Sequence, residues 1–212
     1  MEIVKQIVDK VIEGNIAEVK NLTKQALDQK EDAQRIIGEG FAAGLDVVGE
    51  KYTAGEYFLP EMLVSGMAVT AGMEILKPLL TKSGVKPKGT MVAGTVEGDM
   101  HDIGKNMVCM MVEAAGFKVI DVGADVPAEK FINAAKENRA DIIAMSALLS
   151  TTRQNMPKII QAIRTSELNH KVKVMVGGAP VTQDFADSIG ADGYAPDAGL
   201  AAKKAKELLA VD

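Results

Sequence analysis

The chain has 212 residues, enough for one large or two small domains, and its 47% of apolar residues can bury a core built mainly from aliphatic side chains and 12 methionines. The net charge is −5, whereas a protein that binds nucleic acid usually carries an excess of basic residues. The single cysteine, Cys109, excludes an internal disulfide and a multi-cysteine metal site within one chain. The start resembles an amphipathic helix rather than a signal peptide, and no run of about 18 apolar residues is evident, so we expect a cytoplasmic protein without a membrane partner.

The first part of the chain has the pattern of amphipathic helices. Ile3, Ile7 and Val11 recur at intervals of four residues, which places them on one helix face. Further helices are predicted over about 16–29, 31–52 and 59–80. Four helices joined by short connections predict an antiparallel four-helix bundle over residues 1–86. The Gly-, Pro- and Lys-containing segment 83–89 is the expected domain boundary.

After this boundary, short apolar runs alternate with helical stretches. The predicted strands are 90–96, 118–122, 142–146, 172–176 and 193–195. The predicted helices are 104–115, 127–138, 153–164, 182–189 and 198–209. Five such βα units predict a parallel sheet covered on both faces, in the flavodoxin-like (Rossmann-like) doubly wound order, for a domain over residues 87–212.

In such a sheet, ligands bind at the carboxyl ends of the strands. One of the chain's two histidines, His101, follows the first predicted strand, with Asp99 two residues before it. A carboxylate that orients an imidazole is the usual arrangement around a metal-binding histidine. Two later strand ends carry Ser146 and the pair Gly177–Gly178, where absent side chains leave room for a flat group. The Gly-x-Gly-x-x-Gly and Gly-x-x-x-x-Gly-Lys patterns of phosphate-binding loops are missing.

Together, these strand ends resemble a known family. Asp-x-His-x-x-Gly at 99–104, Ser-x-Leu at 146–148 and Gly-Gly at 177–178 are similar to the cobalamin-binding domain of methionine synthase and its relatives. The helical part resembles the cap domain of the same proteins. The combined length resembles the small corrinoid proteins of methyltransferase systems that serve methylamines, methanol, betaines or methoxylated aromatics.

The resemblance implies a role for each matching residue. His101 would be the lower axial ligand of cobalt, and Asp99 would hold its far nitrogen. Thr152, where methionine synthase has serine, would complete a catalytic triad as a proton relay. Other implied cofactor-binding residues of the second domain are Gly98, Met100, Asp102, Ile103, Gly104, Ser146, Leu148, Ser150, Gly177, Gly178 and Ala198. In the cap, Tyr52, Phe58 and Leu59 would shield the upper face of the corrin.

The implied function is that of a methyl carrier that is not catalytic alone. Its cobalamin or related corrinoid would alternate between Co(I) and methylated forms. Its partners would be a substrate-specific methyltransferase, a second methyltransferase acting on tetrahydrofolate or a thiol, and a reductive activase. Alternatives are a cobalamin-dependent sensor, a mutase subunit and a ligand-free signalling domain.

Simpler structural roles remain open for most of these residues. Asp99, Asp102 and Thr152 could cap helices, and Gly177–Gly178 could form only a tight turn. Tyr52 and Phe58 could belong to the bundle core. The methionines Met62, Met67 and Met73 have nearly helical spacing and are expected in that core.

Overall fold

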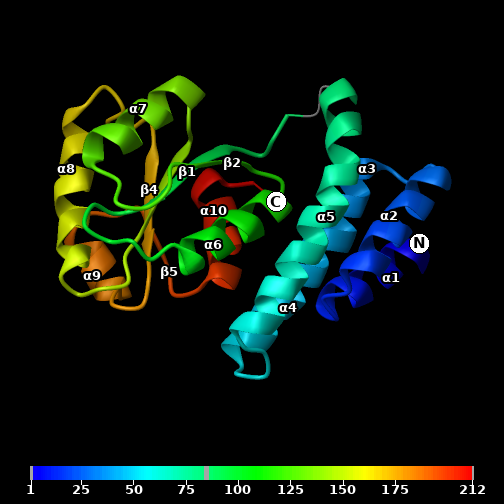
Figure 1. The fold of residues 1–212 in the computed structure, drawn as a ribbon. Helices are drawn as coiled ribbons and strands as arrows, with labels where there is room; N and C mark the ends of the chain where they lie inside the picture. Colours follow the sequence, from blue (N-terminus) through cyan, green and yellow to red (C-terminus); the bar gives the residue numbers. More distant parts are fainter. Residues whose placement is uncertain (1, 84–85, 212) are drawn as a thin grey trace. The chain divides into compact units, whose positions relative to one another are not determined.

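The computed structural model describes residues 2–83 and 86–211, and it divides into two compact units (Figure 1). The first comprises Met1–Pro87 and Glu113–Gly116, and the second Lys88–Val112 and Phe117–Asp212. The division after Pro87 falls within the boundary segment expected at 83–89, of which Gly84 and Val85 lie outside the described residues.

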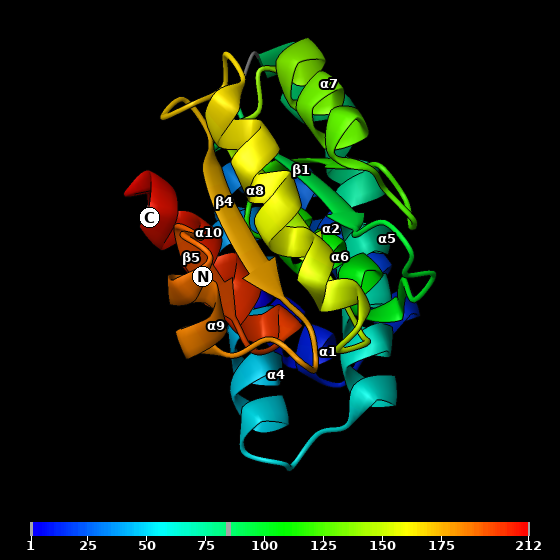
Figure 2. The same ribbon diagram turned by 90° about the vertical axis from the view of Figure 1, so that its left-hand side faces the viewer.

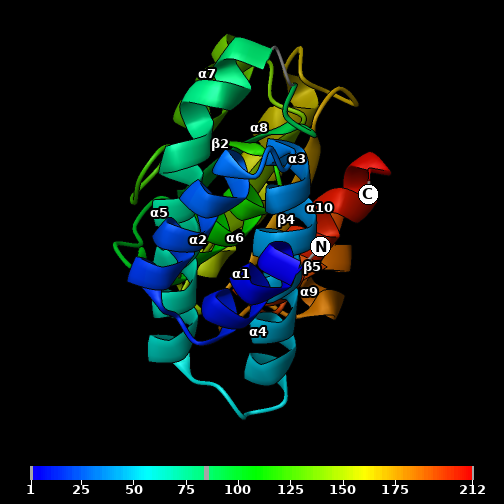
Figure 3. The same cartoon turned by 90° about the vertical axis from the view of Figure 1, so that its right-hand side faces the viewer.

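The first unit is a helical bundle. Its helical segments are α1 (Glu2–Ile12), α2 (Ile16–Asp28), α3 (Ala33–Arg35), the π-helical segment η1 (Ile36–Ala42), α4 (Ala43–Thr53) and α5 (Leu59–Ser83). Helix α1 packs on α2 and α4, and α5 packs on the same two helices, so the four long helices enclose a common core (Figure 3). The predicted four-helix bundle is confirmed. Its fully buried side chains include Ile7, Val11, Val19, Ile36, Phe41, Val48 and Leu76.

Two details of the bundle differ from expectation. The single helix predicted over 31–52 is instead α3, η1 and α4, and its widened π segment contains Gly38 and Gly40, which are poor formers of regular α-helix. Met62 and Met73 are buried as predicted, but Met67 is 50% exposed. Five residues separate Met62 from Met67, which turns the side chain about 140° around the helix and away from the core.

One helix is long and apolar enough to cross a membrane by length and composition. The stretch is Leu59–Leu76 of α5, and 44% of it is buried inside the structure. Core helices of soluble proteins pass the same test, so this is weak evidence for a membrane segment. The statement covers the described residues only.

The second unit is a five-stranded, all-parallel sheet. Its strands are β1 (Thr90–Thr95), β2 (Lys118–Asp121), β3 (Ile142–Ser146), β4 (Lys173–Gly177) and β5 (Gly193–Ala195), in the order β2-β1-β3-β4-β5. Its helical segments are α6 (Ile103–Ala114), α7 (Ala128–Asn138), the 3₁₀ turn η2 (Thr152–Asn155), α8 (Met156–Thr165), α9 (Gln183–Ser188) and α10 (Ala198–Leu209). This is the predicted flavodoxin-like order.

Helices cover both faces of the sheet. Helices α7 and α8 lie on one face, and α6 and α10 lie on the other (Figures 1 and 2). Side chains alternate accordingly along the strands: Val92 of β1 and Ile143 of β3 pack into one core with Phe131 of α7. The register pairs Thr95 with Ser146 and Ser146 with Gly177. The three strand ends that carry the sequence motifs therefore lie side by side at one edge of the sheet.

Candidate functional site

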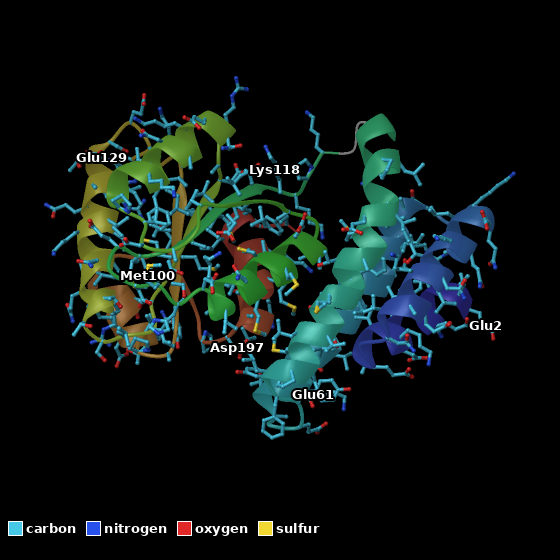
Figure 4. The ribbon with its side chains drawn as sticks, in the orientation of Figure 1. Glu2, Glu61, Met100, Lys118, Glu129 and Asp197 are labelled. Atoms are coloured by element: carbon cyan, nitrogen blue, oxygen red, sulfur yellow. The ribbon has the colours of Figure 1, made fainter. Side chains whose placement is uncertain are left out.

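The segment between β1 and α6 lies at the point where the strand order of the sheet reverses, between the adjacent strands β1 and β3. The helix after β1 covers one face and the helix after β3 covers the other, so the loops after these adjacent strands diverge (Figure 1). Ligands bind at this switch point in open α/β sheets. Figure 4 marks the same edge of the sheet by Met100, which follows β1, and Asp197, which follows β5.

Asp99 and His101 form the centre of this segment. The Asp99 side chain is fully buried, whereas that of His101 is 51% exposed. Nδ1 of His101 lies 2.7 Å from Oδ1 of Asp99, and the backbone N–H of His101 donates to the same oxygen across 3.1 Å. In the neutral ring, an ionised carboxylate partner places the proton on Nδ1 and leaves the lone pair on Nε2.

The second oxygen of Asp99 is held by the loop after β3. The Leu148 N–H donates to Oδ2 across 2.8 Å, the Leu149 N–H across 3.3 Å and the Thr152 hydroxyl across 2.6 Å. The structure therefore joins Thr152, Asp99 and His101 in one hydrogen-bonded series. Thr152 lies in η2, and its hydroxyl also lies 3.0 Å from the Leu149 carbonyl oxygen.

These donors determine the charge of Asp99. Burial alone would raise its pKa because water no longer solvates the carboxylate. Hydrogen bonds from the Thr152 hydroxyl, the Leu148 N–H and His101 outweigh that effect and hold the pKa of Asp99 well below its usual range. The carboxylate is thus a permanent acceptor for Nδ1 at any physiological pH.

Apolar side chains around His101 face outward. Exposed large apolar side chains of the two loops beside the ring are Met100 (72%), Ile103 (58%), Leu148 (46%) and Leu149 (43%). Gly104, at the start of α6, has no atom within 4 Å of the position that a Cβ would take. The exposed ring thus stands among apolar groups beside open space, which suits a flat and largely apolar ligand.

The donor set restricts the kind of metal that could bind here. Among the described residues, no group of three or more His, Cys, Asp or Glu side chains could hold a metal ion. A metal at His101 would therefore have fewer than three such protein ligands and would have to bring most of its other ligands with it. A cobalt ion inside a corrin macrocycle meets this condition, so the residues present fit the implied cofactor.

The two glycines at the end of β4, Gly177 within the strand and Gly178 directly after it, are needed by the protein's own backbone. A Cβ at Gly177 would lie 2.8 Å from the carbonyl oxygen of Ala195. Gly178 has a φ of +119°, and a Cβ there would lie 1.9 Å from the carbonyl oxygen of Ala147. The tight-turn role left open from the sequence is therefore present, and it is compatible with a cofactor-binding role.

The remaining predicted residues of this unit lie at the same edge of the sheet. Ser146 is half-buried at the end of β3, and Ser150 is exposed in the following turn. Ala198 is buried at the start of α10, directly after the capping residue Asp197. Asp102 precedes α6, and its carbonyl oxygen accepts a hydrogen bond from the Asn106 N–H.

Arg153 is a structural contact of this edge that the sequence did not indicate. Its guanidinium donates to the carbonyl oxygen of Pro180 and lies 4.4 Å from the centre of the Phe185 ring. It thereby joins the loop after β3 to the loop after β4. The sequence gives no sign of this contact, because an arginine at the start of a predicted helix is usually solvated.

The predicted cap residues belong to the first unit. Phe58 is 65% exposed and Leu59 is 40% exposed, so the bundle-core role considered for Phe58 is wrong, while Tyr52 is half-buried on α4. The α4–α5 loop is anchored directly before Phe58: the Tyr57 hydroxyl donates to the Ile12 carbonyl oxygen across 3.1 Å.

Comparison with known proteins matches both halves of the chain. Residues 89–203 match the family model of the B12 binding domain, and residues 3–77 match a second B12 binding domain model. A dimethylamine corrinoid protein of Methanosarcina barkeri is 45% identical over 210 residues, which is 99% of this chain and 98% of that protein.

Solved structures agree with these matches. A cobalamin-binding protein from Desulfitobacterium hafniense has a TM-score of 0.83 and 29% identity, covering 97% of this chain and 98% of its own. The methanol:cobalamin methyltransferase complex of Methanosarcina barkeri contains a chain with a TM-score of 0.80 and 32% identity, covering 99% of this chain and 80% of that one.

Proposed function

Because the chain belongs to the B12-binding-domain family, as a corrinoid protein of methyltransferase systems, we propose that it carries methyl groups between two methyltransferases. The first would be specific for a methylated substrate, and the second would act on tetrahydrofolate or a thiol. The single observation that supports this role best is the buried Asp99 carboxylate, which leaves Nε2 of the exposed His101 free as a lone metal ligand.

The bound corrinoid supplies a cobalt atom that alternately accepts and gives up a methyl group. His101 would be its ligand from the protein through Nε2. Asp99 keeps the ring proton on Nδ1 and fixes the plane of the ring. The Thr152 hydroxyl donates a hydrogen bond to Asp99 and so modulates the strength of this acceptor.

Apolar surfaces in both units would shield the cofactor from water. In the second unit, these are Met100, Ile103 and Leu148, beside the strand-end residues already described. The family resemblance gives the same role to Tyr52, Phe58 and Leu59 of the first unit, of which Phe58 and Leu59 are exposed. We propose that the loop that carries Phe58 moves when a methyltransferase reaches the methyl group, which requires release of the hydrogen bond from the Tyr57 hydroxyl to the Ile12 carbonyl oxygen.

The methyl donor and partners are proposed by analogy. The named relatives act with dimethylamine or methanol, and the sequence is similar to both. We favour a methylated amine because the dimethylamine corrinoid protein is 45% identical over nearly the whole chain, against 32% for the methanol system. A reductive activase would restore inactive cobalt, and the system would operate in the cytoplasm.

The ligand assignment can be tested with labelled protein. The chain contains only His101 and His170, and His170 lies exposed in the loop after α8. Protein labelled with ¹⁵N-histidine is loaded with hydroxocobalamin and reduced to the Co(II) form. Electron paramagnetic resonance then distinguishes a ¹⁵N ligand from the ¹⁴N base of the cofactor. We expect the ¹⁵N splitting in the wild type and in H170A, and its loss in H101A.

The donor can then be tested with methyltransferases of known specificity. Reduced, loaded protein is mixed with a dimethylamine-specific or a methanol-specific enzyme and its labelled substrate. Transfer of label to the corrinoid with dimethylamine and not with methanol would support the proposed donor. Transfer only from methanol would overturn it, while the carrier role would stand.

A further inference from the structure

The loop that carries His101 is held from both sides of β1. From the β3 side, the Leu148 N–H and Thr152 hydroxyl hold the Asp99 carboxylate. From β1 itself, the buried Thr95 hydroxyl donates to the carbonyl oxygen of His101 across 3.0 Å. From the β2 side, the loop is contacted by Asp125, in the loop between β2 and α7.

Asp125 makes two hydrogen bonds to the loop that carries His101. Its carboxylate Oδ1 accepts from the Gly98 N–H across 2.7 Å. Its own N–H donates to the Asp99 carbonyl oxygen across 3.0 Å. The two polar groups on either side of the Gly98–Asp99 peptide are thus fixed by one residue. This peptide directly precedes the carboxylate that orients the His101 ring.

The backbone of Asp125 is in an unusual conformation. Its φ is +54°, in the left-handed region that most side chains avoid and that Asp and Asn tolerate best. Gly98, its partner, has a φ of +82°. A glycine at position 125 would relieve the conformation but would provide no carboxylate. The residue present is one that allows both the conformation and the hydrogen bond.

The same pair of hydrogen bonds occurs elsewhere in this unit, at the opposite edge of the sheet. Asp141 accepts from the Thr90 N–H across 2.8 Å, and its own N–H donates to the Thr90 carbonyl oxygen across 2.8 Å. Both aspartates are exposed. Asp141 fixes the beginning of β1, far along the strand from His101, and it serves as a matched control for Asp125.

We propose that Asp125 is a positioning residue for the cobalt ligand: by fixing the Gly98–Asp99 peptide it holds the His101 ring in the orientation that ligates the corrinoid. This rests on the proposed function, in which His101 is the ligand. Removal of the carboxylate leaves only the backbone N–H of residue 125 to hold the loop from the β2 side, so the Gly98 N–H is released and the ring samples orientations that do not reach the metal. The loss of one hydrogen bond corresponds to about a fivefold weaker binding of the corrinoid, or about 1 kcal/mol.

The test measures the Kd for hydroxocobalamin by equilibrium dialysis in full-length variants. We expect D125A and D125G to raise the Kd about fivefold, because D125G removes the carboxylate without backbone strain. D125N keeps an oxygen acceptor and tolerates the left-handed conformation, so it should restore most of the wild-type affinity. D141A should leave the Kd within about twofold of wild type while it lowers the melting temperature of the apo protein.

A double-variant comparison separates positioning from general stability. If Asp125 acts through His101, D125A has no further effect on the Kd once His101 has been replaced in H101A. An equal fivefold effect in both backgrounds, or an equal effect of D141A, would overturn the proposal. So would a wild-type Kd in both D125A and D125G. Absence of the ¹⁵N-histidine splitting in the wild type would instead overturn the ligand assignment itself, and this proposal with it.

Discussion

The Thr152 hydroxyl donates a hydrogen bond to Oδ2 of Asp99 across 2.6 Å, although the two residues are 53 positions apart. Both side chains are buried, and the other Asp99 oxygen accepts from Nδ1 of His101. The interior of the second unit is thereby connected to an exposed imidazole by two short hydrogen bonds. A substitution at Thr152 should therefore affect the His101 ring through Asp99, although no direct contact joins Thr152 to the ring.

Replacement of Thr152 by valine should destabilise the apo protein. Valine has nearly the same shape but no hydroxyl, so the buried Asp99 carboxylate loses one of its donors. We expect the free energy of unfolding in urea to fall by about 1–3 kcal/mol. T152S, which keeps the hydroxyl, should lose less than half as much. Equal losses in the two variants would show that the methyl group, and not the hydrogen bond, is responsible.

Asp99 should make stability depend on acid pH. Its folded-state pKa is lowered, so its ionised form contributes stability at pH values above the usual aspartate pKa of about 3.9. That contribution is lost progressively as the pH falls from about 4 toward the lower folded-state pKa. We therefore expect the wild type to be more stable than D99N at pH 7, and the difference to narrow below about pH 4. Urea denaturation of apo protein at several pH values measures both curves; a difference that stayed constant would contradict this assignment.

The elements of the second unit could be predicted closely because parallel strands buried on both faces are continuous apolar runs. Strand β3 was predicted over 142–146, where it is found, and β1 ends one residue earlier than predicted. The predicted carboxyl ends of the strands indicated where a ligand-binding site would lie. The family resemblance indicated Thr152, but its contact with Asp99 depends on the path of the loop after β3, which the sequence pattern does not specify.

Residues that act through loop backbone could not be predicted. Asp125 lies in a short turn after Gly123, where an aspartate ordinarily indicates only turn geometry. Its partner, the Gly98 N–H, is identified only when the loops after β1 and β2 are placed together. Arg153 is a similar case, because its partner is a carbonyl oxygen in the loop after β4. The sequence also contains no periodic pattern that predicts the π-helical segment η1.

Gly178 should tolerate no side chain. Its φ of +119° is strained for alanine, and a Cβ would lie 1.9 Å from the Ala147 carbonyl oxygen, which is backbone and cannot turn aside. We expect G178A to lose more than about 3 kcal/mol of unfolding free energy in urea. Gly190 provides the control, since it has a φ of +71° but no atom within 4 Å of its Cβ position. G190A should therefore lose only the backbone contribution of about 1–2 kcal/mol. Similar losses in the two variants would mean that the approach of Ala147 is relieved at little cost.

A substitution at Gly104 should have opposite effects on the stability of the apo fold and on the binding of the cofactor. It lies at the start of α6 with open space where a Cβ would be, so the apo fold has no need of glycine there. Alanine favours helix, and G104A should raise the free energy of unfolding of the apo protein by up to about 1 kcal/mol. If the corrinoid occupies that space, the added methyl group should raise the Kd for hydroxocobalamin at least about fivefold, since a steric insertion costs roughly 1–3 kcal/mol. G38A is the matched control, because Gly38 is also helical with nothing within 4 Å, but it lies in the first unit. G38A should bind hydroxocobalamin as the wild type does. A wild-type Kd in G104A would show that the open space at the start of α6 is not where the corrinoid lies.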